Sequence, residues 1–356
     1  MSATIVRIEG EIIYQQPALD KLLDYLEHLH TPHILVVTAL TGLARAVEQE
    51  LEKVHEKDYS PTSLSAFLAS LGKPLLQKSS QSDFHGQGTK LTGLLTGINL
   101  TGDYSPALKD QVLSFSEQLT ALLISLLLKQ KGHVSEVLTP EQIGLRVSAD
   151  FGNATFLSLD QPEFLRREQS SVILIPGSYG MAPNGRIART GRSAADYTAA
   201  FLAGQMKAER LTLWNLRKEF TTANPEIVPE AGTLKRLTYA EASELSYFDH
   251  VDFHPRTVEP LQESHTPIHV IDAGSPGFDP HTVINSEDST GERVVKSIAG
   301  TDDLSVLKLN GPGVGLKPGI LAQITGKLSE QGINIKSVIT SQVSINILLG
   351  RNSGPE

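Results

Sequence analysis

The sequence contains no cysteine, and it has no excess of positive charge. The absence of cysteine excludes a disulfide scaffold, a thiolate metal site and cysteine catalysis. The formal net charge is -9 at pH 7. Because a basic surface is what attracts phosphate groups, this balance favours neither nucleic acid nor an anionic membrane surface. We therefore expect neither as a partner.

Long hydrophobic runs and targeting signals are also missing. The longest apolar run lies around Leu119 to Leu128, is interrupted by Thr120 and Ser125, and is too short to cross a bilayer. The first residues, which begin Met1-Ser2-Ala3, do not have the shape of a signal peptide. These absences predict a cytoplasmic protein without a membrane-spanning segment.

The length of 356 residues predicts roughly two domains. An apolar fraction of 40% lets such a chain bury a large core without metals or disulfides. The histidines between Glu27 and His33 lack the spacing of two ligands on consecutive helical turns, and Pro32 interrupts any helix there. We therefore expect no metal site.

Apolar runs and amphipathic segments alternate in the first part of the chain. Ile5 to Ile8 and Ile34 to Val37 read as buried strands. Pro17 to His28 reads as an amphipathic helix, and a second helix runs from the turn at Thr41-Gly42 through Leu51. This alternation predicts an α/β sheet that is covered on both faces.

The periodicity weakens between Asp58 and Asp110. Gly, Ser, Gln and Lys dominate Lys78 to Lys90, a composition that predicts a mobile loop. Further elements are then expected as a helix over Asp110 to Lys131, a strand over Val172 to Pro176, a helix over Ser193 to Met206, a strand over Leu211 to Trp214, a helix over Tyr239 to Tyr247 and a strand over Ile268 to Ile271.

A polar segment rich in turn-forming residues, Asp279 to Glu292, marks the expected domain boundary. The predicted domains are residues 1–290 and 298–350. The second would contain a strand over Leu304 to Leu309, a helix over Ile320 to Gln331, and strands over Ile335 to Thr340 and Val343 to Leu349.

Six motifs, in their expected order, resemble those of the aspartokinases in the amino-acid-kinase superfamily. The segment Gly191-Arg192-Ser193-Ala194-Ala195-Asp196-Tyr197-Thr198-Ala199 resembles the signature G-R-G-G-S-D-Y-T-A. The other five are Phe151-Gly152-Asn153-Ala154, Gly177-Ser178-Tyr179-Gly180 with Asn184-Gly185-Arg186, Trp214 with Asn224-Pro225, Tyr239-Ala240-Glu241-Ala242, and His254-Pro255-Arg256-Thr257. The resemblance implies a three-layer, carbamate-kinase-like α/β sandwich. It also implies transfer of the γ-phosphoryl group of ATP to the side-chain carboxylate of L-aspartate, a step of aspartate-family amino-acid biosynthesis.

The C-terminal segment resembles the regulatory ACT module, which has a ferredoxin-like fold. The resemblance rests on Gly311-Pro312-Gly313-Val314-Gly315, Gly332-Ile333-Asn334-Ile335 and Thr340-Ser341-Gln342. It implies lysine or threonine as an effector. Only the β-α-β-β half is found, so we expect a partial module that leaves a sheet edge unpaired. Residues 304–349 would then pair with the same segment of a second subunit in a homodimer.

The resemblance assigns several residues to the amino-acid substrate. Arg192 would pair with a carboxylate of L-aspartate, because a guanidinium matches it with two parallel hydrogen bonds. Asp196 and Glu117 would receive the substrate ammonium. Thr38 and Thr41, in a loop resembling S-A-x-x-G-x-T, would donate to the reacting carboxylate. The alternative interpretation is that these are helix caps and solvated charges.

The nucleotide half departs from the family pattern. The strand that should end K-F-G-G-T-S reads Arg7-Ile8-Glu9-Gly10-Glu11-Ile12, which adds carboxylates where backbone N–H groups should approach phosphates. The resemblance still assigns the catalytic role to Arg7, Arg192 and Asp196. It assigns nucleotide binding, by ATP with Mg²⁺ if the protein is active, to Gly10, Gly177, Asn215 and Lys218. The carboxylate of T-D-V is replaced by Leu216, and the lysine of F-G-A-K-V-L-H-P by Val251.

Three hypotheses follow. The protein is a catalytically impaired aspartokinase relative that binds aspartate or a regulatory amino acid, an active aspartate kinase with a remodelled ATP pocket, or a kinase for another small carboxylate. The lost nucleotide residues favour the first hypothesis. The retained Arg192 and Asp196 argue against the third.

Overall fold

The computed structural model describes residues 4–28, 33–102, 104–161, 171–216, 220–248, 253–287, 295–314 and 317–351. The chain divides into two compact units, Met1–Ile298 and Ala299–Glu356.

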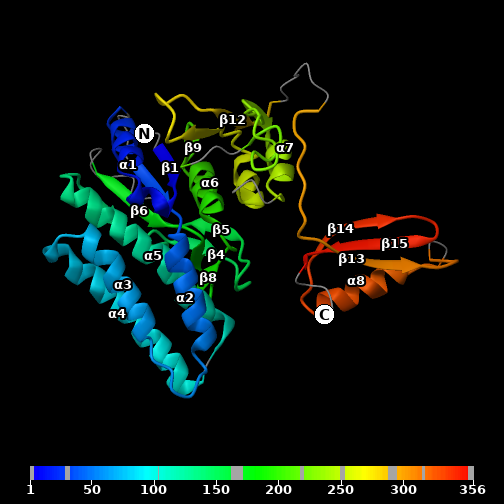
Figure 1. The fold of residues 1–356 in the computed structure, drawn as a ribbon, viewed down its shortest axis with the longest axis horizontal. Coiled ribbons are helices and arrows are strands. Elements are labelled where there is room, and N and C mark those ends of the chain that lie inside the picture. Colours follow the sequence, from blue (N-terminus) through cyan, green and yellow to red (C-terminus); the bar gives the residue numbers. More distant parts are fainter. Residues whose placement is uncertain are drawn as a thin grey trace. The chain divides into compact units, whose positions relative to one another are not determined.

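The larger unit is built on an eight-stranded sheet with the order β10-β12-β11-β9-β1-β2-β6-β3 (Figure 1). Its strands are β1 (Thr4–Ile8), β2 (His33–Val37), β3 (Ser135–Val137), β6 (Val172–Pro176), β9 (Leu211–Asn215), β10 (Arg236–Thr238), β11 (Ile268–Asp272) and β12 (Thr282–Asn285). All neighbouring strands are parallel except β11 and β12. The expected α/β class is therefore confirmed.

Helices cover both faces of this sheet, because its central strands are apolar on both sides. In β2, Leu35 and Val37 pack with α1 (Gln16–Glu27), α2 (Thr41–Lys53) and α5 (Pro106–Gln130), whereas Ile34 and Val36 pack with α6 (Ala195–Gln205). Helix α7 (Tyr239–Leu245) and the 3-10 helix η3 (Pro255–Leu261) lie with α6, and the short 3-10 helix η1 (Gly10–Tyr14) follows β1. This three-layer arrangement brings the ends of β1 and β2 next to the starts of α2 and α6.

A second, four-stranded sheet was not predicted from the sequence. Its order is β5-β4-β7-β8, with β4 (Leu145–Val147), β5 (Phe156–Leu159), β7 (Tyr179–Met181) and β8 (Ile187–Arg189). These strands have three or four residues each, too few for an apolar alternation to be recognised. Strand β8 packs on α5 and carries Arg189 toward it.

The prediction of a mobile loop over Lys78 to Lys90 is wrong. This segment belongs to α4 (Lys78–Thr101), which packs between α3 (Thr62–Leu75) and α5 (Figure 1). The buried residues of α4 follow a helical repeat of four and three positions: Phe84, Gly88, Leu91, Leu95 and Ile98. Gly88 belongs to this repeat because a Cβ there would lie 2.9 Å from a methyl group of Leu68 in α3. The glycine that suggested a loop is instead a site of close helix packing.

Helix α5 is long and apolar enough, by length and composition, to cross a membrane, but 72% of its most apolar window is buried inside the protein. It packs against α2, α4 and the strands β3, β6 and β8. We conclude that α5 is the central core helix of this layer.

The smaller unit contains a three-stranded antiparallel sheet with the order β13-β15-β14, formed by β13 (Ser305–Asn310), β14 (Ile335–Thr340) and β15 (Ser344–Leu349). Helix α8 (Ile320–Glu330) packs on one face of it, over Ile345, Ile347 and Leu349. Among the residues that the structure describes, β13 and β14 each pair only with β15, so both edges of the sheet are open there.

Candidate functional site

The sequence-predicted substrate residues come together around one cavity of about 540 Å³ at the ends of β1 and β2. Its lining includes Arg7, Thr38, Thr41, Glu117, Arg192 and Asp196. Because Arg7 and Arg192 both border this cavity, their guanidinium groups are not separated by the sheet. These six residues therefore line one cavity, and the roles that the sequence assigns to them stay predictions.

Arg7 and Asp196 form an ion pair in the wall of this cleft. Arg7 Nε lies 2.5 Å from Asp196 Oδ1, and the two side chains are only 3% and 5% exposed. The other carboxylate oxygen of Asp196 accepts a hydrogen bond of 3.3 Å from the His254 backbone N–H. Both oxygens of this predicted ammonium receptor are thus engaged within the chain.

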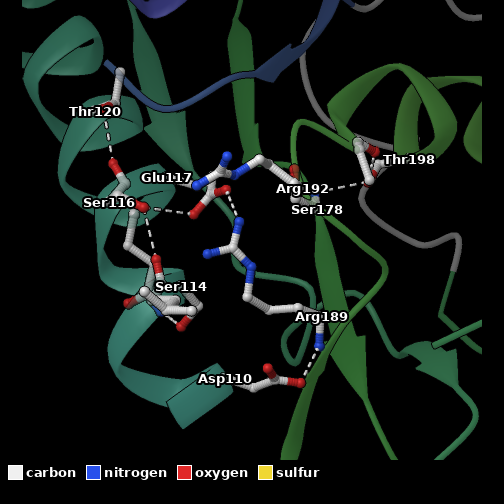
Figure 2. A network of polar contacts seen from close by, with 12 residues as sticks. Asp110, Ser114, Ser116, Glu117, Thr120, Ser178, Arg189, Arg192 and Thr198 are labelled. Atoms are coloured by element: carbon white, nitrogen blue, oxygen red, sulfur yellow. Dashed lines mark hydrogen bonds and ion pairs between the residues drawn. The ribbon is translucent and has the colours of Figure 1, made fainter. Parts of the chain in front are cut away.

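The second predicted ammonium receptor, Glu117, is paired with Arg189, which was not predicted from the sequence as a site residue. Arg189 Nη2 donates to Glu117 Oε1 at 2.8 Å, and the Ser116 hydroxyl donates to Oε2 at 2.9 Å (Figure 2). Burial raises the pKa of Glu117, while Arg189 and Ser116 act in the opposite direction. The signal that could have identified Arg189 is a cation in the short apolar segment just before the signature motif.

Arg189 also borders a second cavity, of about 490 Å³, and Arg192 lines both cavities as well. The backbone around Arg189 is fixed by Asp110, which accepts hydrogen bonds from the N–H groups of Arg189 (2.8 Å) and Gly152 (2.7 Å) (Figure 2). Burial raises the pKa of Asp110, against the opposing effect of these bonds. Asp110 therefore holds β8 in place beside α5.

Arg192 differs from the buried pairs because its side chain is 83% exposed. Its Nη2 lies 3.2 Å from Glu48, whose side chain is 40% exposed. Such a solvated contact holds a side chain weakly. The next residue, Ser193, has a φ of 53°, and Ser178 across the cleft has a φ of 69°. Both are non-glycine residues in the left-handed region, which is uncommon and concentrates at functional sites.

The two carboxylates that follow β1 hold backbone donors at the mouth of the cleft. Glu9 Oε1 accepts the Leu216 N–H at 3.1 Å and lies 3.5 Å from Arg7 Nη1. Glu11 Oε1 accepts the Thr41 N–H, at the start of α2, at 2.7 Å. A helix start is where an anion is favoured, so Glu11 provides one from within the chain.

The predicted nucleotide-binding residues lie in different environments. A Cβ on Gly10 would lie 2.8 Å from Leu40 N, and one on Gly177 would lie 2.6 Å from Ala195 Cβ, so both glycines permit close packing. Asn215 is fully buried, and its side-chain amide has no hydrogen-bond partner among the described residues. Lys218 lies outside the described residues.

The lining of the larger cavity carries nearly equal numbers of positive and negative side chains. It contains four arginines, Arg7, Arg45, Arg189 and Arg192, against five carboxylates, Glu9, Glu11, Glu48, Glu117 and Asp196, which gives a formal charge of -1. Across the described ranges, no group of three or more His, Cys, Asp or Glu side chains could hold a metal ion. The amide of Asn215 has no hydrogen-bond partner among the described residues, but Asn215 does not line this cavity.

Comparison with known proteins identifies the family. Residues 3–272 match the model of the amino acid kinase family, and residues 300–351 match that of the ACT domain. The chain is 26% identical over 260 residues to a bifunctional aspartokinase/homoserine dehydrogenase of Haemophilus influenzae, covering 72% of this chain and 32% of that protein. It is 29% identical over 235 residues to aspartokinase 2 of Bacillus subtilis, covering 65% and 57%. The chain thus spans about a third to just over half the length of these curated relatives.

Solved structures support the same assignment at the level of the fold. The crystal structure of Escherichia coli aspartokinase III in complex with aspartate and ADP matches with a TM-score of 0.79 and 22% identity, over 98% of this chain and 78% of that one. The same enzyme in complex with lysine and aspartate matches with a TM-score of 0.75 and 20% identity, over 99% and 80%. The chain therefore belongs to the amino acid kinase family, within its aspartokinase group, and carries a C-terminal ACT domain.

Proposed function

We propose that this chain is a divergent aspartokinase-group protein whose transfer of phosphoryl groups from ATP to L-aspartate is strongly impaired. In this proposal, the cleft still binds a small dicarboxylic acid of the L-aspartate class. Phosphoryl transfer requires positioning of the acceptor and neutralisation of phosphate charge. The predicted acid-binding residues line one cavity, but the groups around the predicted phosphate position are unfavourable for a polyanion.

The proposal rests on the observation that Glu9 and Glu11 occupy backbone N–H groups that would otherwise be free to bind an anion. These side chains take the Leu216 and Thr41 N–H groups, and Arg7 is held by Asp196 and Glu9. Hydrogen bonds to charged groups are worth roughly 1.5–3 kcal/mol each. A nucleotide must displace two of them and meet two like charges, so we expect weak ATP binding.

The test is a coupled assay of ADP release with L-aspartate and Mg·ATP, run beside a calorimetric titration of Mg·ATP. We expect no L-aspartate-dependent ADP release and no saturation at micromolar Mg·ATP. Micromolar affinity together with turnover would refute the impaired kinase. It would support the second candidate, an active aspartate kinase with a remodelled ATP pocket. The comparison that favours this candidate is the match to Escherichia coli aspartokinase III, whose structure was solved in complex with aspartate and ADP.

The proposal extends to assembly, regulation and location. We propose a cytoplasmic homodimer formed through residues 304–349, with lysine or threonine as an effector of the ACT domain. The open edge of β13 and the exposed Val306 (59%) support the pairing of sheets between subunits.

Val306→Lys should shift the mass measured by light scattering from dimer to monomer, because a lysine on a sheet edge opposes pairing. Val134→Lys, at a similarly exposed valine of the larger unit, is the control and should remain dimeric. A wild-type monomer would contradict this part of the proposal.

A further inference from the structure

The arginines Arg189 and Arg192, which line two cavities, indicate which class of acid the cleft binds. Arg189 and Arg192 both line the cavities of about 540 and 490 Å³. The Arg189 guanidinium uses one nitrogen, Nη2, on Glu117 and makes no other hydrogen bond to the described residues. Its remaining N–H groups are thus available to a ligand, and they suit a carboxylate.

Arg189 also occupies the carboxylate of Glu117, which is the group predicted to receive the substrate ammonium. Glu117 is almost completely buried, and its two oxygens accept from Arg189 and Ser116 (Figure 2). An ammonium that approached this carboxylate would meet a guanidinium already bound at 2.8 Å. Like charges brought together in a desolvated site repel strongly. Asp196 attracts a further cation less strongly, because Arg7 already compensates its charge and its other oxygen accepts the His254 N–H.

We infer that Arg189 acts as a built-in replacement for the substrate ammonium, so that the cleft selects a dicarboxylate without an α-amino group over L-aspartate. Arg189 and Arg192 would hold the two carboxylates of this ligand. The inference rests on the proposed function, in which the cleft binds a small dicarboxylic acid, and it defines the chemical class of that acid. It makes Arg189 a residue that determines specificity.

The test compares succinate with L-aspartate by calorimetry on the full chain without nucleotide, because the two acids differ only in the ammonium group. We expect wild-type protein to bind succinate at least about tenfold more tightly. In Arg189→Gln, Glu117 becomes available to an ammonium, and the preference should move toward L-aspartate by at least about tenfold. Arg146→Gln breaks a surface pair with Asp160 (2.6 Å) and leaves the cavities intact, so it should keep the wild-type ratio.

Arg189→Gln leaves Glu117 buried without its cation, which threatens folding. If thermal melts show that this variant is unfolded, the double variant Arg189→Gln/Glu117→Gln is measured in its place, because it removes both charges of the buried pair. Its two acids should then bind within about threefold of each other. The inference would be overturned if the wild type preferred L-aspartate or bound neither acid. It would also be overturned by an unchanged ratio in Arg189→Gln or by a tenfold preference for succinate in the double variant. The ADP-release assay is separate: turnover would refute the impaired kinase without deciding the ratio of the two acids.

Discussion

Replacing Glu9 with glycine and Glu11 with threonine should restore nucleotide binding. These are the residues that the family pattern has at the two positions. The change frees the N–H groups of Leu216 and Thr41 and leaves Arg7 paired with Asp196. It also removes two negative charges from a cavity whose formal charge is -1.

The magnitude follows from the two released donors. Each hydrogen bond to a phosphate oxygen is worth roughly 1.5–3 kcal/mol. Two of them would strengthen binding by about 3–6 kcal/mol, or on the order of 10²- to 10⁴-fold in Kd. Because such contributions are not additive, we expect the lower end of this range.

Calorimetric titration of ADP into wild type and the double variant measures this gain. The control is Glu52→Gln/Glu56→Gln, which removes two charges from exposed positions outside the cavity lining and should leave ADP affinity unchanged. Thermal melts establish that each variant is folded. If the Glu9→Gly/Glu11→Thr variant binds ADP within about threefold of wild type, the two carboxylates do not block the nucleotide, and this part of the reasoning is wrong.

Three further predictions concern stability and binding. Asp196→Asn should cost up to about 3–5 kcal/mol in urea unfolding, because it removes the closer charge partner of the buried Arg7 and leaves Glu9, at 3.5 Å, whereas Asp20→Asn in the exposed pair with Lys131 should cost less than about 1 kcal/mol. Arg192→Ala should weaken binding of the dicarboxylate on the order of tenfold without a measurable change in Tm, since that side chain is 83% exposed; unchanged affinity would remove Arg192 from the site. Burial, with a smaller effect of Arg256, lowers the pKa of His254 to about 4. Because the unfolded chain then binds this proton more readily than the folded chain, protonation of His254 favours unfolding. We expect the free energy of unfolding to be retained above about pH 6.5 and to fall by up to about 3 kcal/mol as the pH drops toward 4. His254→Gln should flatten this part of the pH profile, and an equal slope in both proteins would contradict the assignment.

The parts of the fold that the sequence predicted are those where a long apolar pattern decides the structure. Ile34 to Val37 and Val172 to Pro176 are uninterrupted apolar runs, and both are buried central strands. The β4, β5, β7 and β8 strands were not predicted because three or four residues carry no clear period. Local patterns identify an element, whereas the small sheet depends on contacts between distant segments.

The same distinction applies to the cleft. Motif order assigned Arg7, Glu117 and Asp196 to one predicted site, and all three line one cavity. It could not indicate that Arg7 pairs with Asp196, or that Arg189 pairs with Glu117, because these partners are far apart along the chain. Charge pairing inside the cleft is a property of the folded backbone, and it changes what each retained residue can bind.

Helix α4 has a consequence for local opening of the structure. It contains four glycines, Gly86, Gly88, Gly93 and Gly97, and each costs about 1 kcal/mol of helical propensity relative to alanine. Gly88 alone of the four meets a neighbour closely, at Leu68. The helix is therefore a poor one by itself and persists through the side chains that it buries against α3 and α5. Its amide hydrogens should exchange with solvent well before those of the neighbouring α5, as a unit that unfolds while the central sheet remains intact.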